Sequence, residues 1–569
     1  MNSRRQRICV AMRGAMLLGL GISGAPFAWS EAPANKPVSR EQYIRTPPLS
    51  PAPRLNVALR VGARPDRPFH YTIPATGDRP MSFSVDGLPA GLAVDPTRGV
   101  ISGKTPSAGT YPLKIGATNS HGTNEVTVQL VIGQQLALTP PMGWNTYNAF
   151  RMRIDDALIR RQADAMVSSG LVNFGYSYIN IDDGWQGQRD HAGAIQGNAK
   201  FPDMKALGDY LHAKGLRFGI YSSPGPKTCA EYEGSYGFEV SDARTYASWG
   251  VDFIKYDWCS YDAIAHNRLA EIYGALLPEH ADRLRAIVAE RNPLFASRVR
   301  PRPPEQSARL RELAAEFERL IQAVDAGKRS SIIREVHIEP YRRFGEALSS
   351  VDRDIVYSLC QYGMESPGEW AGGVGGHLWR TTRDITPNWN AVNRISQQQV
   401  GLEANAKPGG WNDPDMLEVG NGTLTPDEMH SHMTQWSILA APLILGTDLT
   451  KMDSLTMSVV ANHEVIAVNQ DPLGRQGRRA WVNGSTDIWT KSMADGSIAV
   501  ALFNRGEAQA TITVPIAELG LDLGAAPAQP IRDLWRQRDL PASNVLTAEV
   551  AAHGAELFRV GKPSGTIGR

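Results

Sequence analysis

The sequence predicts a multidomain protein in which a (β/α)8 barrel is flanked by two antiparallel β-sandwiches. Three observations lead to this prediction. The 569 residues are too many for one ordinary domain. Across residues 134–474, short apolar runs alternate with amphipathic runs of helical period, which is typical of βαβ units. On both sides of this region, short runs of alternating apolar and polar residues are separated by turn residues, as in antiparallel sheets.

The clearest predicted barrel strand covers residues 251–259. Its nearly continuous apolar and aromatic character is typical of a parallel strand that is buried on both faces. It also carries Lys255 and Asp257, which are two residues apart and therefore share one face of the strand. A charged pair in a buried strand is costly unless a functional site uses it. The pair is therefore either part of a site or a buried ion pair that only satisfies itself.

The other predicted elements continue the alternation of strands and helices. In chain order they are a helix at 155–169, a strand at 177–183, a helix at 204–214, a strand at 216–222, a helix at 241–249, a strand at 354–359 and a helix at 385–399. Polar residues, among them Asp182, Asp183 and Tyr221, gather at the carboxyl ends of the strands, which form the active-site face of a (β/α)8 barrel. An open doubly wound sheet is the alternative, but the glycine-rich phosphate loop expected after its first strand is missing from the sequence.

The flanking segments, residues 54–133 and 475–569, are predicted to be β-sandwiches. The first carries Leu88–Leu92 and Gly99–Gly103, which resemble segments of the immunoglobulin-like modules often attached to secreted glycan enzymes. A spacer role is favoured over accessory sugar binding. Residues 263–338 interrupt the barrel pattern and predict a helical insertion, whose apolar stripe we interpret as packing.

The N-terminus predicts export. Residues 1–34 combine several arginines with the apolar run 15–22, which is typical of a secretory signal peptide, and a linker with five prolines follows at 35–53. Ser3-Arg4-Arg5 leaves twin-arginine export open, and a membrane anchor is the alternative. No later run is long and apolar enough to span a membrane. We therefore expect a secreted or periplasmic protein.

Charge and cysteine content narrow the expectations further. The formal net charge of +1 gives no support for a nucleic-acid or anionic-membrane partner. Of the four cysteines, Cys9 lies in the predicted signal peptide. The remaining three predict one disulfide and one buried thiol in an exported chain, and their number alone leaves the pairing open.

Acidic stretches at strand ends and in loops point to carbohydrate chemistry. They cover residues 181–185, 255–257, 380–384 and 411–416. Carboxylates beside aromatic and arginine side chains suit neutral, polyhydroxylated ligands, and glycoside hydrolysis needs two carboxyl groups across the scissile bond. One must be ionised and the other protonated, and Lys255 is expected to keep Asp257 ionised. His430 and His432, the closest histidine pair, are interpreted as surface residues, so neither a metal nor a cofactor is expected.

At these residues the chain resembles glycoside hydrolase family 27, which contains retaining α-galactosidases and α-N-acetylgalactosaminidases. The matching motifs follow the family order across about residues 136–480. They are Pro140–Asn145, Ile181–Trp185, Gly219–Tyr221, Lys255–Cys259, Trp379–Asp384, Gly409–Met416 and Asn469–Gly474.

The resemblance implies a role for each matching residue. Asp257 would be the nucleophile and Asp384 the acid/base. The implied substrate-binding residues are Trp144, Tyr147, Asp182, Asp183, Tyr221, Lys255, Gln361, Arg380 and Asp415. Many relatives have Glu at the position of Gln361, near the sugar 2-substituent, so this chain departs from the pattern there. The resemblance also implies a disulfide between Cys229 and Cys259 and leaves Cys360 as a free buried thiol.

The function implied by the resemblance is hydrolysis of terminal α-galactosyl residues through a covalent glycosyl-enzyme, with a carbohydrate substrate as partner. The alternatives of the same class are a β-L-arabinopyranosidase and an α-N-acetylgalactosaminidase, because these sugars share the axial hydroxyl. A non-catalytic sugar-binding protein is the alternative of another class. Because Asp257 and Asp384 are both present, hydrolysis is favoured. The sequence leaves the oligomeric state open.

Overall fold

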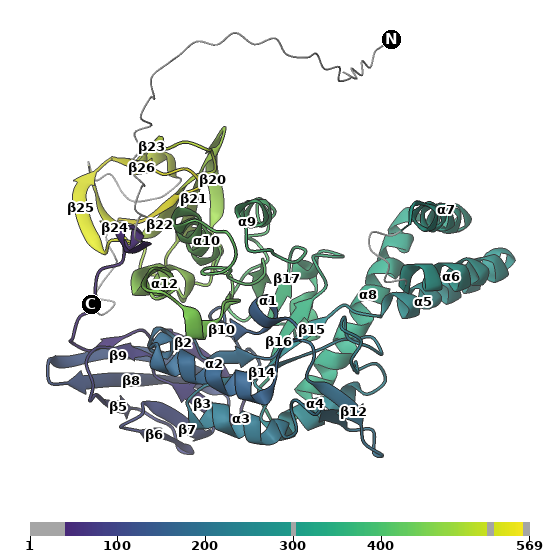
Figure 1. The fold of residues 1–569 in the computed structure, drawn as a ribbon, viewed down its shortest axis with the longest axis horizontal. Helices are drawn as coiled ribbons and strands as arrows, with labels where there is room; N and C mark the ends of the chain where they lie inside the picture. Colours follow the sequence, from purple (N-terminus) through teal and green to yellow (C-terminus); the bar gives the residue numbers. More distant parts are fainter. Residues whose placement is uncertain (1–39, 297–302, 520–527, 562–569) are drawn as a thin grey trace, which may run out of the picture. The chain divides into compact units, whose positions relative to one another are not determined.

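Eight parallel strands form a closed barrel (Figure 1). The computed structural model describes residues 40–296, 303–519 and 528–561, so the predicted signal peptide lies outside the described residues. The strands are β10 (Met142–Asn145), β11 (Tyr178–Asn180), β14 (Arg217–Ser222), β15 (Phe253–Asp257), β16 (Val356–Cys360), β17 (Leu378–Arg380), β18 (Trp411–Asp413) and β19 (Leu443–Leu445).

Strand pairing confirms the predicted barrel. The hydrogen-bonded order is β18-β17-β16-β15-β14-β11-β10-β19, and neighbours in it run parallel. A parallel bridge between Leu417, which follows β18, and Leu445 of β19 brings the two ends of the sheet together. The open doubly wound sheet is therefore excluded.

Helices connect the strands, and polar caps begin several of them. They are α2 (Asp156–Ser168), α3 (Met204–Ala213), α4 (Glu239–Trp249), α9 (Trp389–Gln397) and α10 (Pro426–Ile438). The Asp155 carboxylate accepts from the Leu158 amide at 2.7 Å and begins α2. Helix α9 begins four residues later than predicted, because Asn388 caps it by accepting from the Ala391 amide. The chain between Asp384 and Asn388 is thus free to form an active-site loop.

Among the described residues between β15 and β16, the chain forms four α-helices. They are α5 (Asp262–Leu276), α6 (Ala281–Ala296), α7 (Pro304–Ile321) and α8 (Ala326–Ser349). Leu313, Phe317 and Ile321 of the predicted apolar stripe are buried in a small core of their own, as expected for packing residues. Helix α8 continues beyond residue 338 onto the barrel, where the Phe344 ring stacks on Tyr256 of β15 at a centroid distance of 4.1 Å.

The N-terminal module has the predicted sandwich architecture. Its strands are β1 (Arg54–Leu55), β2 (Arg60–Ala63), β3 (Pro68–Thr72), β4 (Ala75–Thr76), β5 (Ser82–Asp86), β6 (Leu92–Asp95), β7 (Val100–Lys104), β8 (Gly109–Asn119) and β9 (Gly122–Ile132). The expectation of purely antiparallel strands is wrong at one place, because β2 pairs with β9 in parallel. Strand β2 lies at an open edge of its sheet and is not joined to β9 by a hairpin, so a turn does not dictate its direction.

The C-terminal module is antiparallel, as predicted. Its strands are β20 (Arg478–Asn483), β21 (Thr486–Ser492), β22 (Ile498–Asn504), β23 (Ala510–Pro515), β24 (Gln529–Asp533), β25 (Arg538–Ser543), β26 (Val545–Val550) and β27 (Ala555–Val560). Helix α10 contacts β22 and β27 of this module. The interpretation of His430 and His432 as surface residues is therefore wrong: both are fully buried in α10, and the His430 ring meets Trp535 edge-on.

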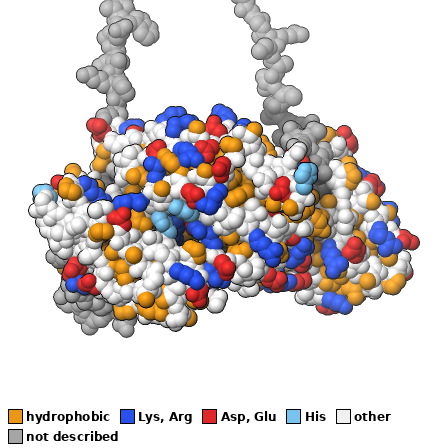
Figure 2. Space-filling model, turned by 90° about the horizontal axis from the view of Figure 1, so that it is seen from below, with side chains coloured by type: hydrophobic (Ala, Val, Ile, Leu, Met, Phe, Trp, Pro, Cys, Tyr) orange, Lys and Arg blue, Asp and Glu red, His pale blue; other side chains and the backbone are white. Residues whose placement is uncertain are grey.

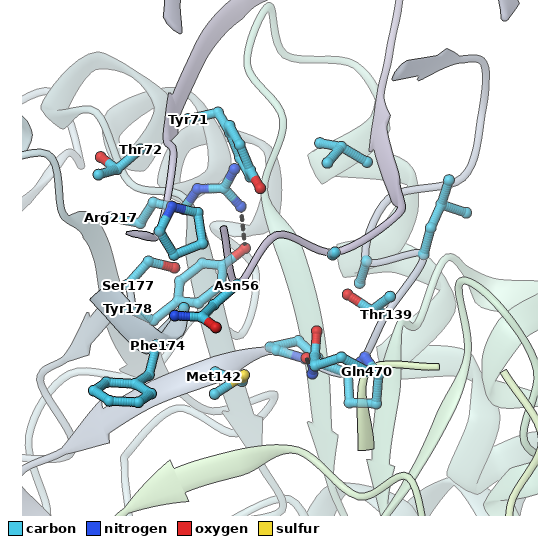
Figure 3. Close-up of a pocket in the computed structure, with 18 of the residues that line it drawn as sticks. Asn56, Tyr71, Thr72, Thr139, Met142, Phe174, Ser177, Tyr178, Arg217 and Gln470 are labelled. Atoms are coloured by element: carbon cyan, nitrogen blue, oxygen red, sulfur yellow. Dashed lines mark hydrogen bonds between the residues drawn. The ribbon is translucent and has the colours of Figure 1, made fainter. Parts of the chain in front are cut away.

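The N-terminal module is fastened to the amino ends of the barrel strands, which is the end opposite the predicted active site. The amide and guanidinium of Arg64 both donate to the Asp354 carboxylate, at 2.9 and 2.7 Å. Arg217, at the start of β14, donates to the His70 carbonyl and to the Tyr178 hydroxyl. Figure 3 shows the cavity of about 110 Å³ beside this contact, into which Tyr71 projects near Arg217.

Replacing Arg64 by alanine should destabilise the protein by about 2 kcal/mol, because it leaves the largely buried Asp354 carboxylate without its charged donor. The measurement is urea unfolding followed by tryptophan fluorescence. Lys104→Ala is the matched control, since the Lys104–Asp66 pair is mostly exposed and should contribute little. Equal losses in the two variants would contradict the expected role of Arg64.

The surface carries both signs of charge. On the face of the molecule drawn in Figure 2, basic and acidic side chains are interspersed. No helix within the described residues is long and apolar enough to cross a membrane.

Candidate active site

A cavity of about 90 Å³ opens at the carboxyl ends of the barrel strands. Seven of the eight strands contribute to it directly or through the loop that follows them, and β19 is the exception. The lining residues are Tyr147, Asn148, Arg151, Asp182, Asp183, Tyr221, Cys229, Lys255, Asp257, Tyr362, Arg380, Asp384, Ile385, Asp415 and Met416. The fold thus brings together nine of the eleven predicted catalytic and substrate-binding residues, although they are spread over 269 residue positions from 147 to 415.

Asp257 ends β15 with its carboxylate buried in the cavity. The Tyr221 hydroxyl donates to Oδ2 at 3.0 Å. No donor in the described part of the chain reaches Oδ1 in hydrogen-bond geometry, so this buried oxygen keeps its lone pairs available. Burial raises the pKa of Asp257, whereas the charge of Lys255 and the nearby Tyr362 hydroxyl oppose that rise.

The predicted pairing of Lys255 with Asp257 is wrong in its details. The Lys255 ammonium donates to Asp182 Oδ2 at 2.9 Å, and Asp182 follows β11, which β14 separates from β15. Its charge still lowers the pKa of Asp257, but the larger effect of burial leaves that pKa above its ordinary value. Local spacing suggested the nearer carboxylate, whereas the barrel places a residue 73 positions away within reach.

Asp182 and Asp183 follow β11 and are both buried. Asp182 also accepts from the Asn145 amide at 2.9 Å, so two donors hold one of its oxygens. Asp183 Oδ2 accepts from the Ala230 amide, while Oδ1 is buried without a donor among the described residues. Burial raises the pKa of Asp183 to about 6. Oδ1 of Asp183 is therefore an open acceptor for a ligand hydroxyl.

Arg380 connects the carboxylates on the other side of the cavity. Its buried guanidinium donates to Asp384 at 3.1 Å and forms an ion pair with Asp415 at an N–O distance of 3.0 Å. The Asp384 side chain is 69% exposed and lies at the mouth, whereas Asp415 is buried. Asp415 also accepts from the Ile385 amide at 2.8 Å, which ties the loop after β18 to the loop after β17. These contacts hold Asp384 near the entrance.

The cysteines behave as expected. Cys229 and Cys259 form a disulfide, and Cys360 is a free buried thiol. The Tyr221 hydroxyl lies 3.3 Å from Cys259 Sγ, so the disulfide abuts the side chain that holds Asp257. Cys229, Asp257 and Cys259 are the one cluster of possible metal ligands found within the described residues. Because both sulfurs are in the disulfide, the cluster offers no thiolate to a metal.

Two predicted residues do not line the cavity. Trp144 is fully buried behind it, and its indole donates to the Thr447 carbonyl. Gln361 is also buried, and neither of its amide atoms has a partner among the described residues.

The structure adds Asn148, Arg151 and Tyr362 to the cavity lining. Tyr362 adopts φ 60° and turns the chain directly after β16, so its place after a buried strand was the signal that could have identified it.

A buried carboxylate supports the wall that carries Asn148. Glu418 is fully buried behind the cavity, and its carboxylate accepts from the side-chain amides of Asn148 and Asn421. Burial, together with the charge of Asp415, raises the pKa of Glu418 from 4.5 to about 7. The protonated form of Glu418 therefore persists close to neutral pH in the folded protein.

Glu418→Gln should make stability less dependent on pH. The folded state holds the Glu418 proton up to about pH 7, whereas the unfolded chain releases it near pH 4.5. Stability from the protonated carboxyl is thus complete below pH 4.5 and is lost as the pH rises through 7. Relative to the wild type, the variant should gain up to about 3 kcal/mol between pH 4.5 and 7.5.

Thermal unfolding at the two pH values measures the effect of Glu418→Gln. Glu279→Gln serves as an exposed control and should show no such gain. An unchanged pH dependence in Glu418→Gln would show that Glu418 is not the titrating group.

The fold and the cavity together define a barrel enzyme of the glycoside hydrolase class. The chain belongs to the alpha galactosidase A family, whose model matches residues 139–298 and 315–471. A model of the alpha galactosidase C-terminal β-sandwich matches residues 483–560, and a model of Ig domains matches residues 52–133.

Known proteins resemble the chain over most of its length. Alpha-galactosidase 2 of Arabidopsis thaliana is 38% identical over 435 residues, which cover 76% of this chain and 91% of the relative. A candidate alpha-galactosidase/melibiase from Bacteroides fragilis has a solved structure that covers 91% of this chain and 100% of its own, with a TM-score of 0.75 and 33% identity. The structure of an alpha-galactosidase from Saccharomyces cerevisiae with raffinose is 25% identical, with a TM-score of 0.58, and covers 75% of this chain and 98% of its own.

Proposed function

We propose that this chain is a retaining exo-α-galactosidase that releases terminal α-galactosyl residues from oligo- or polysaccharides. The observation that carries the proposal is the pair of Asp257 and Asp384 in one cavity. Inside the cavity, Asp257 offers an oxygen that has no donor among the described residues, and Asp384 lies exposed at the cavity mouth. These are the positions expected of an attacking carboxylate and of a proton donor to a departing group.

The proposed reaction has two steps. Oδ1 of Asp257 attacks the anomeric carbon while Asp384 donates a proton to the glycosidic oxygen, which leaves with the rest of the substrate. Asp384 then removes a proton from a water molecule that displaces Asp257 from the galactosyl-enzyme. Two inversions at the anomeric carbon regenerate the α-anomer. Tyr221 holds Oδ2 of Asp257 throughout, so that one oxygen is positioned and the other reacts.

The remaining polar residues would bind the sugar hydroxyls. Asp182 and Lys255 form one connected pair at one side of the cavity, and Arg380 and Asp415 form a second pair. Each pair offers both donors and acceptors to neutral hydroxyl groups. The similarity to the Saccharomyces cerevisiae enzyme solved with raffinose supports an α-galactoside as substrate.

A panel of aryl glycosides tests the proposal. We expect the purified protein to cleave 4-nitrophenyl α-galactoside faster than the corresponding β-L-arabinopyranoside and α-N-acetylgalactosaminide. NMR during the first turnovers should show α-galactose before mutarotation. Faster cleavage of the β-L-arabinopyranoside or the α-N-acetylgalactosaminide would show that an α-galactoside is not the preferred substrate. Formation of β-galactose as the first product would contradict the retaining mechanism.

We also propose that the mature protein acts outside the cytoplasm. The basic and apolar N-terminal residues support export, and a disulfide beside the active site suits an oxidising compartment. N-terminal sequencing of protein from cell fractions tests this proposal. Uncleaved protein confined to the cytoplasm would contradict it.

A further inference from the structure

Arg151 lies at the mouth of the cavity in a constrained position. It follows the single-turn helix α1 (Tyr147–Phe150), and its amide donates to the Tyr147 carbonyl at 2.8 Å. Its backbone adopts φ 52°, which turns the chain at the cavity. Arg151 is exposed, and its guanidinium carbon lies 4.6 Å from the centroid of the Tyr147 ring. Contact with the ring face orients the planar guanidinium, whose edge has no hydrogen-bond acceptor among the described residues.

Arg151 differs from the other two cations that line the cavity. Lys255 is paired with Asp182, and Arg380 is paired with Asp384 and Asp415. Within the described residues, Arg151 has no carboxylate at ion-pair distance. The charge of Arg151 acts on Glu418, but that carboxylate is buried and already accepts from two asparagine amides. The Arg151 charge at the mouth is therefore not neutralised by an ion pair.

Hydrogen bonds to the buried Glu418 carboxylate hold the turn that carries Arg151. Glu418 accepts from Asn148 in the middle of α1, and Asn421 fastens the same carboxylate to the loop after β19 through the Gly446 carbonyl. Three of the five residues from 147 to 151 line the cavity, so one supported turn presents a ring, an amide and a guanidinium to a ligand. A site of this kind is organised before the ligand binds, which lowers the entropic cost of binding.

We propose that Arg151 forms a subsite for an anionic group, a carboxylate or a sulfate, that the substrate carries at the cavity mouth. The edge of a guanidinium matches the two oxygens of such a group. The subsite rests on the proposed α-galactosidase function and refines its substrate class to galactosides that carry an acidic group. That group belongs either to the leaving portion or to the exocyclic carbon of the galactosyl unit.

A different role for Arg151 would be to offset the carboxylates of the cavity without touching the substrate. In that case, removal of its charge would affect neutral and acidic substrates alike. The two roles are therefore separated by the ratio of kcat/KM for an acidic substrate to kcat/KM for a neutral one.

Three substrates distinguish the sources of the acidic group. They are 4-nitrophenyl α-galactoside, an aryl α-galactoside with a carboxylate on the aryl ring, and 4-nitrophenyl α-galactoside sulfated at the C6 oxygen. The wild type should prefer one of the two acidic substrates, and the preferred one identifies where the anion sits. In Arg151→Gln, the ratio of kcat/KM for that acidic substrate to kcat/KM for the neutral one should fall by about tenfold at low salt.

Two further variants and a salt series complete the test. Arg151→Lys should keep part of the preference, because the charge remains without the planar fork. Arg153→Gln is the matched control, since Arg153 is exposed on the same loop but does not line the cavity, and it should leave the ratio unchanged. Added salt should weaken the wild-type preference. Thermal unfolding of each variant verifies that it is folded.

Several results would overturn the proposal. They are a wild type that prefers neither acidic substrate, an unchanged ratio in Arg151→Gln, or an equal loss on neutral and acidic substrates in that variant. If the wild type hydrolyses none of the three galactosides, the proposed function and the subsite both fall. If it hydrolyses the neutral galactoside without any preference, only the subsite falls.

Discussion

Replacing Asp257 by glycine should lower kcat for an aryl α-galactoside by about 10⁴-fold or more, because no other carboxylate can take over its place at the end of β15. Asp384 lies at the mouth of the cavity, Asp182 is paired with Lys255, and Asp415 is paired with Arg380. The glycine leaves a space where the nucleophile stood. Initial rates with a substrate whose leaving group is already reactive measure the loss.

Azide distinguishes a lost nucleophile from a damaged fold. In Asp257→Gly, azide should enter the vacated space, restore part of the rate and give a β-galactosyl azide, because only one inversion takes place. Circular dichroism and thermal unfolding should match those of the wild type. Activity near the wild-type level would remove Asp257 from the proposed mechanism.

Replacing Asp384 by alanine should have a different signature. With a poor leaving group, the rate should fall by about 10²–10⁴-fold, because proton donation to the glycosidic oxygen is lost. With a reactive aryl leaving group, the first step needs little protonation, so hydrolysis of the galactosyl-enzyme should become rate-limiting. A burst of released phenol followed by slow turnover is therefore expected in stopped-flow measurements.

Azide should also accelerate Asp384→Ala, but its product should be the α-galactosyl azide, because Asp257 still forms the intermediate and two inversions take place. The two variants are thus each other's controls, and the anomer of the azide assigns the roles. A β-azide from Asp384→Ala, or equal losses on good and poor leaving groups, would contradict the acid/base assignment. Arg380→Lys removes the guanidinium that holds Asp384 but keeps the Asp384 carboxyl group. It therefore separates the effect of positioning Asp384 from the effect of the carboxyl group itself.

The barrel strands could be predicted because their signals are local. The apolar residues of 251–257 recur without the helical period, and in the structure β15 is buried on both sides. Asp182, Tyr221 and Asp257 stand at strand ends in the sequence, and the parallel sheet carries them to one edge. Once the strands are known to be parallel, their carboxyl ends must lie at the same edge of the sheet. The location of the site therefore follows from the polar residues at the strand ends.

The pairing of charges could not be predicted in this way. Lys255 is two residues from Asp257 in the strand, yet it bonds Asp182, because its long side chain reaches past β14 to the end of β11, two strands away in the barrel. The burial that raises the pKa of Asp257 likewise comes from several strands together. The burial of His430 and His432 could not be predicted for the same reason, since His430 packs against Trp535 of the C-terminal module and His432 accepts from the Glu418 amide of the barrel.

The sequence by itself therefore determined the barrel, the two flanking sandwiches and most of the residues that line the cavity. The apolar pattern of a strand and the polar residues at its end can both be recognised within a short segment of the chain. Only the tertiary structure decided which side chains meet. In the folded protein Lys255 bonds to Asp182. Trp144 and Gln361 lie outside the cavity lining, whereas Tyr362 and Arg151 belong to it. Hydrogen bonds and charge pairs form between atoms a few ångströms apart, and those distances exist only once the barrel has closed.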